Sequence, residues 1–182
     1  NSNGEYIAFL DSDDLWFSEK LEVCIKSFHS GVDIVFHDFV KYGNVNFFTK
    51  KIMKGRKLPT PVTKSLLLQD NVIINSSVIV RKKIIKDVGC IDESKDMIAA
   101  EDYNLWLKIS IITNNFLYIP RVLGEYLVGD GNISSKDMSV CSKRASENFE
   151  RYLTVDELLQ YDAILNYMKG RYFYINKEYF AA

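Results

Sequence analysis

Short apolar runs typical of β-strands alternate with helical patterns up to about residue 135, and this alternation constrains the fold more than any other feature. The first run covers residues 5–10 and the second covers residues 33–39. Between them, the spacing of Leu21, Cys24, Ile25 and Phe28 predicts an amphipathic helix that Ser18 would cap. Strands that alternate with helices in this way are typical of an α/β sheet. Further strands are expected at 71–80, 116–119 and 122–127, and further helices at 64–68, 82–88 and 101–113.

The pattern becomes wholly helical from residue 137 onward. Thr154 and Glu157 stand at the spacing of a capping box, which predicts the start of a helix that Gly170 can end. The sequence therefore predicts two parts, an α/β domain over residues 1–135 and a helical extension over residues 136–182.

Composition excludes several classes of protein. The chain has 182 residues, of which 47% are hydrophobic and 26% are charged, and these are ordinary values for a globular protein. We expect neither a secretory signal peptide nor a helix that spans a membrane. The three cysteines lie far apart, which predicts neither a disulfide framework nor a zinc site. These features favour a cytoplasmic protein.

The net charge of −1 hides a basic segment, because residues 41–86 hold eleven Lys and Arg residues and one acidic residue. One interpretation is a solvated loop. The other is a patch that faces an anionic membrane surface or a phosphorylated lipid. We expect no nucleic acid as a partner, since no nucleic-acid-binding motif surrounds these residues.

Three carboxylates, Asp11, Asp13 and Asp14, directly follow the first apolar run. In α/β sheets, ligands gather at the carboxyl ends of strands. Asp11 and Asp13 stand at alternate positions and can reach one Mg²⁺ or Mn²⁺, with water and phosphate oxygens completing its shell. The alternative is a solvated acidic turn. A calcium-binding EF-hand loop is excluded, because Leu15 and Trp16 stand where that loop needs a ligand and a glycine.

A second acidic pair, Glu101 and Asp102, begins the helical pattern at 101–113. Acidic residues at a helix N-terminus are stabilised by the helix dipole, which is the simplest interpretation. The functional alternative is a general base, because a carboxylate near a bound hydroxyl can take its proton as the oxygen attacks.

Taken in order, these motifs resemble family 2 inverting glycosyltransferases. Residues 4–16 are similar to the centre of that family, which contains its DxD motif, and residues 101–107 are similar to its catalytic "ED" segment. The resemblance extends to its strand before the acceptor region, its "GGFDE" turn and its closing strands and loop, at residues 75–81, 88–93, 118–120 and 131–134.

The resemblance implies a partial GT-A domain that uses a nucleotide-diphospho-sugar donor. It places Asp11 near the ribose of the donor and Asp13 on a Mn²⁺ or Mg²⁺ ion that bridges the diphosphate. It assigns Asp102 as the general base of a single displacement that inverts the anomeric centre. Glu101 would shape the acceptor site, and Trp106 would either face the acceptor sugar or pack in the core.

The sequence departs from the family pattern at its start, in one loop and at its C-terminus, which stops inside a helix-like pattern. The family's beginning is absent, and it corresponds to at least two βαβ units of about 30 residues each. Residues 127–130 replace the Arg and His with which many members cover the diphosphate.

The sequence thus predicts a glycosyltransferase of cell-surface polysaccharide biosynthesis that acts on a glycan or lipid-linked acceptor. It would work in the cytoplasm or at the inner face of the plasma membrane. The alternatives are a non-catalytic fragment and an α/β binding module without turnover.

Overall fold

The computed structural model describes residues 2–45, 51–69, 71–129 and 136–178. The chain divides into two compact units, each assembled from separate stretches of sequence. The sheet unit comprises Asn1–Pro59, Val72–Cys90 and Ile112–Gly129. The helical unit comprises Thr60–Asn71, Ile91–Ile111 and Asp130–Ala182.

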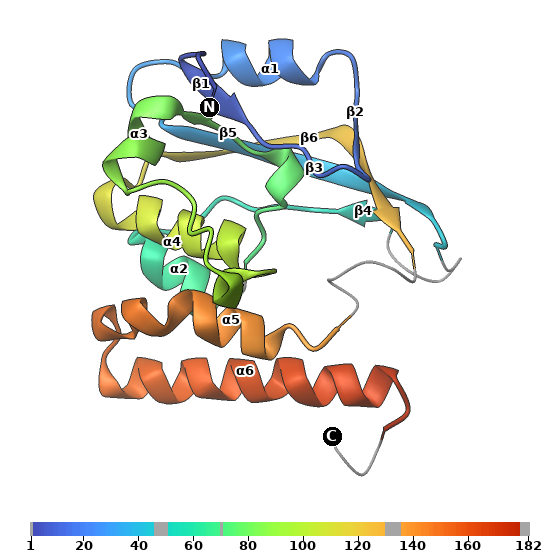
Figure 1. The fold of residues 1–182 in the computed structure, drawn as a ribbon, viewed down its shortest axis with the longest axis vertical. Helices are drawn as coiled ribbons and strands as arrows, with labels where there is room; N and C mark the ends of the chain where they lie inside the picture. The colour runs from blue at the N-terminus through green and yellow to red at the C-terminus, as the bar shows by residue number, and fades with distance from the viewer. Residues whose placement is uncertain (1, 46–50, 70, 130–135, 179–182) are drawn as a thin grey trace. The chain divides into compact units, whose positions relative to one another are not determined.

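The sheet unit is built on a mixed sheet of six strands, drawn as arrows in Figure 1. The two long central strands, β3 and β6, run parallel, and all other pairs are antiparallel. The order is β1-β5-β3-β6-β2, and β4 pairs with β3 outside this path. The strands are β1 (Tyr6–Ala8), β2 (Leu15–Trp16), β3 (Ile34–Gly43), β4 (Ile52–Met53), β5 (Ile79–Arg81) and β6 (Phe116–Val128).

The two strands predicted on either side of Pro120 form one strand, β6. Ile119 is the partner of His37 and Val122 is the partner of Asp38, so two residues of β6 bulge out between these pairs. Proline has no backbone N–H to donate to the ladder, and a bulge accommodates it. The sheet therefore continues past the proline.

Helix α1 (Lys20–Lys26) covers one face of the sheet, where Cys24 packs among Val35, Ile79 and Leu123. The prediction of Ser18 as its cap is wrong, because Glu19 occupies that position and makes no side-chain capping bond. The predicted apolar face of α1 is also wrong in part: Leu21 and Ile25 are exposed, while Lys20 is buried.

The strand predicted over residues 71–80 is short in the structure. A 3-10 turn, η1 (Asn75–Ser77), interrupts it, and only β5 is a strand. The Ser77 hydroxyl donates to the Ile74 carbonyl over 2.6 Å, a local bond that competes with sheet pairing. After β5 comes α3 (Lys82–Asp87), the helix expected at 82–88.

The helical unit contains α2 (Val62–Leu68), η2 (Lys95–Met97), α4 (Glu101–Ile112), α5 (Ser139–Ser146), η4 (Glu147–Tyr152) and α6 (Val155–Ile175). In Figure 1, α5 and α6 lie side by side. The predicted capping box at Thr154 and Glu157 is confirmed, but α6 continues through Gly170 to Ile175. A glycine within a helix costs only about 1 kcal/mol. The sheet and the C-terminal helices confirm the expected α/β class with a helical extension.

Polar bonds hold the helices of this unit together. The Tyr103 hydroxyl of α4 donates to the Leu66 carbonyl of α2 over 2.9 Å, and Asn104 donates to the Ala145 carbonyl of α5 over 2.9 Å. Lys64 of α2 contacts both carboxylate oxygens of Glu157 at 2.7 Å. These contacts set the start of α4, where Asp102 lies, against its neighbours.

Candidate active site

The three carboxylates predicted to bind the donor or its ion, or to form an acidic turn, lie between β1 and β2: Asp11, Asp13 and Asp14. The Asp14 N–H donates to the Asp11 carbonyl over 3.2 Å and closes this turn. Asp13 is exposed, Asp11 is half-buried and Asp14 is buried. The turn therefore presents Asp13 to solvent, and Asp14 supports it from within.

The η1 turn holds the Asp11 end of this loop. Asn75 Nδ2 donates to Asp11 Oδ1 over 2.6 Å, and the Asp11 N–H donates to Ser76 Oγ over 3.0 Å. Trp16 Nε1 donates to the Ser76 carbonyl over 2.8 Å. The positioning roles of Asn75 and Ser76 were not predicted from the sequence. Hydroxyl and amide side chains within an otherwise apolar strand pattern were the signal that could have found them.

Asp14 differs electrostatically from its two neighbours. Burial raises the pKa of its carboxyl group, and the charges of Asp11 and Asp13 add to the effect. Asp14 Oδ1 accepts a hydrogen bond from the Leu127 N–H over 3.2 Å. Asp14 therefore joins the turn to the end of β6. It is a structural acid, and the sequence did not distinguish it from its neighbours.

A divalent cation suits the donor set of this turn. Among the residues that the structure describes, no three His, Cys, Asp or Glu side chains come together to enclose an ion. Mg²⁺ is usually held by one or two carboxylates plus water and substrate phosphate oxygens, and Asp13 offers such a carboxylate in an exposed position. The residues present fit an ion that binds together with a diphosphate.

A buried cation lies next to the turn. Lys20 is 0% exposed, and its ammonium group lies 3.6 Å from the centre of the Trp16 ring. Its Nζ has no hydrogen-bond partner among the described residues, and burial lowers its pKa to about 8. His37, also buried, has a pKa lowered to about 4 by burial. Neither burial was predicted from the sequence.

The second half of the predicted site begins α4 in the helical unit. Asp102 Oδ1 accepts a hydrogen bond from the adjacent Tyr103 N–H over 2.6 Å. Asp102 and Tyr103 line a cavity of about 190 Å³, with Met138, Cys141 and Met168 among its other walls. A carboxylate that borders a cavity can meet a small polar molecule such as a sugar hydroxyl.

Glu101 and Trp106 share α4 with Asp102 but differ from it in surroundings. Glu101 is half-buried, and its Oε2 has no hydrogen-bond partner among the described residues. Trp106 is fully buried, which favours the packing role that the sequence left open. The structure thus brings Asp11 and Asp13 together in one turn of the sheet unit. The other three predicted site residues share one helix of the helical unit, namely Glu101, Asp102 and Trp106.

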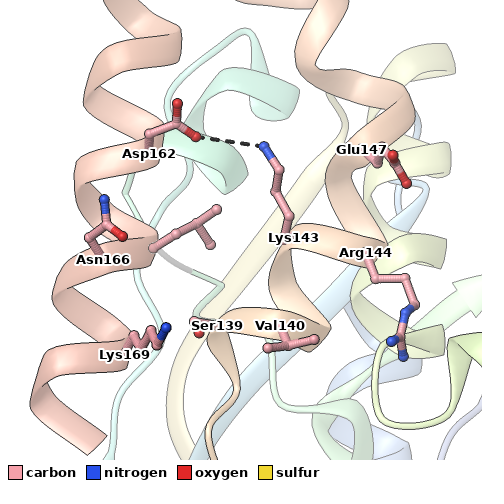
Figure 2. A pocket seen from close by; sticks show the side chains of 9 residues that line it. Ser139, Val140, Lys143, Arg144, Glu147, Asp162, Asn166 and Lys169 are labelled. Atoms are coloured by element: carbon pink, nitrogen blue, oxygen red, sulfur yellow. Dashed lines mark ion pairs between the residues drawn. The ribbon is translucent and has the colours of Figure 1, made fainter. Parts of the chain in front are cut away.

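A further hollow of about 580 Å³ lies between α5 and α6, and Figure 2 shows its side chains. Lys143 lies 3.6 Å from Asp162 and 2.6 Å from Glu150. The Glu150 carboxylate, followed by Asp162, raises the pKa of Lys143. These acids neutralise the ammonium group, so this hollow is an ion-paired seam between two helices.

The basic segment is divided between the two units. Arg81 lies near Glu5 and Asp33, and Lys64 is paired with Glu157 in the helical unit. Lys51, Lys54 and Lys57 are exposed in the sheet unit, while Lys50 lies outside the described residues, as does the predicted loop at 131–134. No helix within the described ranges is long and apolar enough to cross a bilayer.

Comparison with known proteins identifies relatives of the chain. Residues 1–89 match the family model "Glycosyl transferase family 2". Uncharacterized glycosyltransferase MJ1057 of Methanocaldococcus jannaschii is 24% identical over 180 residues, which cover 98% of this chain and 56% of that protein. UDP-Glc:alpha-D-GlcNAc-diphosphoundecaprenol beta-1,3-glucosyltransferase WfgD of Escherichia coli is 30% identical over 137 residues, or 74% of this chain and 50% of WfgD.

A crystal structure of S. aureus TarS 1-349 in complex with UDP-GlcNAc shares the fold. Its TM-score is 0.52 at 15% identity, and the match covers 94% of this chain and 57% of TarS 1-349. The match confirms the expected GT-A architecture with C-terminal helices. The chain spans about half the length of the relatives it matches. Residues 1–89 therefore carry a glycosyl transferase family 2 domain, and the chain comprises part of the fold of its relatives.

Proposed function

We propose that this chain is the later part of a glycosyltransferase that moves a sugar from a nucleotide-diphospho-sugar to a hydroxyl of a glycan or lipid-linked acceptor. The turn that exposes Asp13, with Asp11 held by Asn75, carries this proposal. WfgD is named for a UDP-glucose donor, and TarS was crystallised with UDP-GlcNAc. A UDP-sugar is therefore the donor class to test first.

In this proposal the sheet unit binds the donor diphosphate. Asp13 holds Mn²⁺ or Mg²⁺, and Asp11 lies near the ribose. When bound, the ion supplies electrophilic assistance by neutralising the departing nucleoside diphosphate. Asn75 and Ser76 position Asp11 so that donor binding does not have to order its side chain.

The helical unit supplies the base. Asp102 takes the proton of the acceptor hydroxyl as its oxygen attacks the anomeric carbon, and one displacement inverts that centre. Glu101, on the same helical turn, shapes the acceptor site. The burial of Trp106 favours a supporting role for it behind this helix.

We also propose where the protein works and how it divides. The exposed Lys51, Lys54 and Lys57 would favour an anionic membrane surface on the cytoplasmic side, where cell-surface polysaccharides are assembled. We place the boundary between the transferase portion and the helical extension at residues 135 and 136. This position is supported by β6, which ends at Val128, and by α5, which begins at Ser139.

The experiment is Mn²⁺-dependent release of UDP from UDP-glucose and UDP-GlcNAc, measured on this chain and on a version with the upstream family sequence restored. Asp13→Asn should abolish the metal dependence. Asp156→Asn, the same change at an exposed residue of α6, should leave it intact. Metal-dependent release that survives Asp13→Asn would refute the donor assignment.

The half-length match to its relatives favours a second candidate, an acceptor-binding fragment without turnover. UDP release by the short chain would exclude this fragment. Release by the restored version alone would support it.

A further inference from the structure

A groove of about 740 Å³ runs along the C-terminal half of α6 in the helical unit. Its walls combine five hydrocarbon or thioether side chains with two tyrosines, two amides and two basic residues. Methionine side chains are flexible and polarisable, so they adapt to irregular apolar ligands. The principal apolar walls are Met138, Ile164, Met168, Tyr172 and Ile175.

The groove adjoins the cavity that contains Asp102. Met138 and Met168 line both hollows, so each is a shared wall between them. A ligand longer than a single sugar can therefore occupy the Asp102 cavity with one end and continue past these two methionines into the groove.

The charge in the groove has one sign. Arg171 and Lys136 are its charged residues, and no acidic residue lines it within the described part of the chain. In the hollow between α5 and α6, by contrast, Lys143 is paired with Asp162, as Figure 2 shows. Glu150 neutralises the same ammonium group. A groove that combines apolar side chains with basic residues, and that no acidic residue lines, fits an amphiphile with an anionic head and a hydrocarbon chain.

The order of side chains along α6 matches the order of groups in such a molecule. Met168 borders the Asp102 cavity, Arg171 lies about one turn further on and Ile175 about one turn beyond Arg171. At about 1.5 Å per residue, the rise from Met168 to Ile175 is about 10 Å. Read from the cavity outward, the sequence of groups is a sugar site, a basic residue and an apolar wall.

We propose that this groove binds the isoprenoid diphosphate portion of a lipid-linked acceptor. The sugar lies in the cavity at Asp102, the diphosphate lies at Arg171 and Lys136, and the hydrocarbon chain lies against Ile164, Tyr172 and Ile175. This inference rests on the proposed transferase function and names the acceptor class for it. A bare glycan has neither an anionic group to pair with Arg171 and Lys136 nor a hydrocarbon chain to cover Ile175.

The test is binding of farnesyl diphosphate, a short isoprenoid diphosphate, by calorimetry on the full chain. Inorganic diphosphate and farnesol serve as probes for the head and the chain alone. Farnesyl diphosphate should bind at least about tenfold more tightly than either one, because each part of the groove contributes. Equal binding of inorganic diphosphate would reduce the groove to an anion site and overturn the proposal.

Matched variants locate the binding site. Ile175→Asp and Arg171→Glu should each weaken binding about tenfold, whereas Leu159→Asp and Lys169→Glu should leave it within about twofold. Ile175 and Leu159 are exposed to a similar degree, 63% and 66%, and Leu159 and Lys169 line no part of the groove. Equal effects in all four variants would refute the assignment. So would a concentration-dependent dimer that Ile175→Asp dissolves, since a second copy would then cover the groove.

Failure of this inference and failure of the proposed function give different results. Transfer to a water-soluble sugar acceptor without farnesyl diphosphate binding would refute the lipid-binding role of the groove and would leave the transferase function supported. Farnesyl diphosphate binding at Ile175 and Arg171 without any sugar transfer would support the lipid-binding role of the groove and refute the transferase function.

Discussion

Replacement of Lys20 by methionine should stabilise the protein at neutral pH. The side chain is fully buried, and burial lowers its pKa from the ordinary 10.5 to about 8. That difference corresponds to about 3 kcal/mol of unfavourable free energy for the charged form in the folded state. Contact with the Trp16 ring returns up to about 2 kcal/mol. Lys20→Met should therefore raise the free energy of unfolding at pH 7 by about 1 to 3 kcal/mol.

The pH dependence gives the sign of the effect. The unfolded chain keeps the Lys20 proton up to about pH 10.5, while the folded chain releases it near pH 8. The unfolded state thus binds more protons between these values, and wild-type stability contains a contribution that rises with pH there. The advantage of Lys20→Met should be complete below pH 8 and should disappear toward pH 10.5.

The assay is guanidinium denaturation of both proteins at pH 7, 8, 9 and 10. The neighbouring Cys24 has a pKa raised to about 11, and it lowers stability above pH 9 in both proteins. The difference between the two proteins largely removes that contribution. Lys26→Met, on the exposed side of α1, should change stability by less than about 0.5 kcal/mol. The reasoning is refuted if Lys20→Met destabilises the protein at pH 7, or if its advantage is the same at pH 7 and pH 10.

Three further predictions concern the sheet unit. Asn75→Ala removes the 2.6 Å hydrogen bond to Asp11 and should raise the KM for a UDP-sugar about tenfold, as measured by UDP release. An unchanged KM would show that this hydrogen bond does not position Asp11. His37, whose pKa falls from 6.5 to about 4, should cause a stability loss approaching about 3 kcal/mol as pH drops through that range, since only the unfolded chain takes up its proton. Urea denaturation from pH 7 to 4 should show a shallower loss for His37→Phe, and parallel curves would contradict the burial argument. Charge reversal of Lys51 and Lys54 should reduce co-sedimentation with anionic vesicles, and unchanged sedimentation would exclude the membrane role of these residues.

The motifs of this chain could be predicted from sequence because their chemistry is local. A capping box needs only Thr154 and Glu157 at the right spacing, and the structure contains it. Carboxylates after a β-prone run similarly mark the end of β1, because side-chain type and strand pattern are both visible in the sequence. The family and the α/β class followed from the order of such motifs.

Features that depend on contacts between distant residues could not be predicted in this way. Lys20 looks like a surface residue at a helix start, and its burial depends on Trp16 lying over it. The hydrogen bond from Asn75 to Asp11 joins residues that are 64 positions apart in the sequence. Gly170 looks like a helix end, yet α6 passes through it, since one glycine costs less than the loss of the following turn.

The central claim is that Asp102 is the base of a metal-assisted sugar transfer, and one measurement tests it most directly. Transfer from a UDP-sugar to an acceptor is followed for the full-length enzyme with Asp102→Asn, and with Asp96→Asn as the exposed control in the same unit. We predict that Asp102→Asn lowers kcat by about 10²- to 10⁴-fold with an unchanged donor KM, while Asp96→Asn retains full activity. A kcat that survives Asp102→Asn would contradict the account.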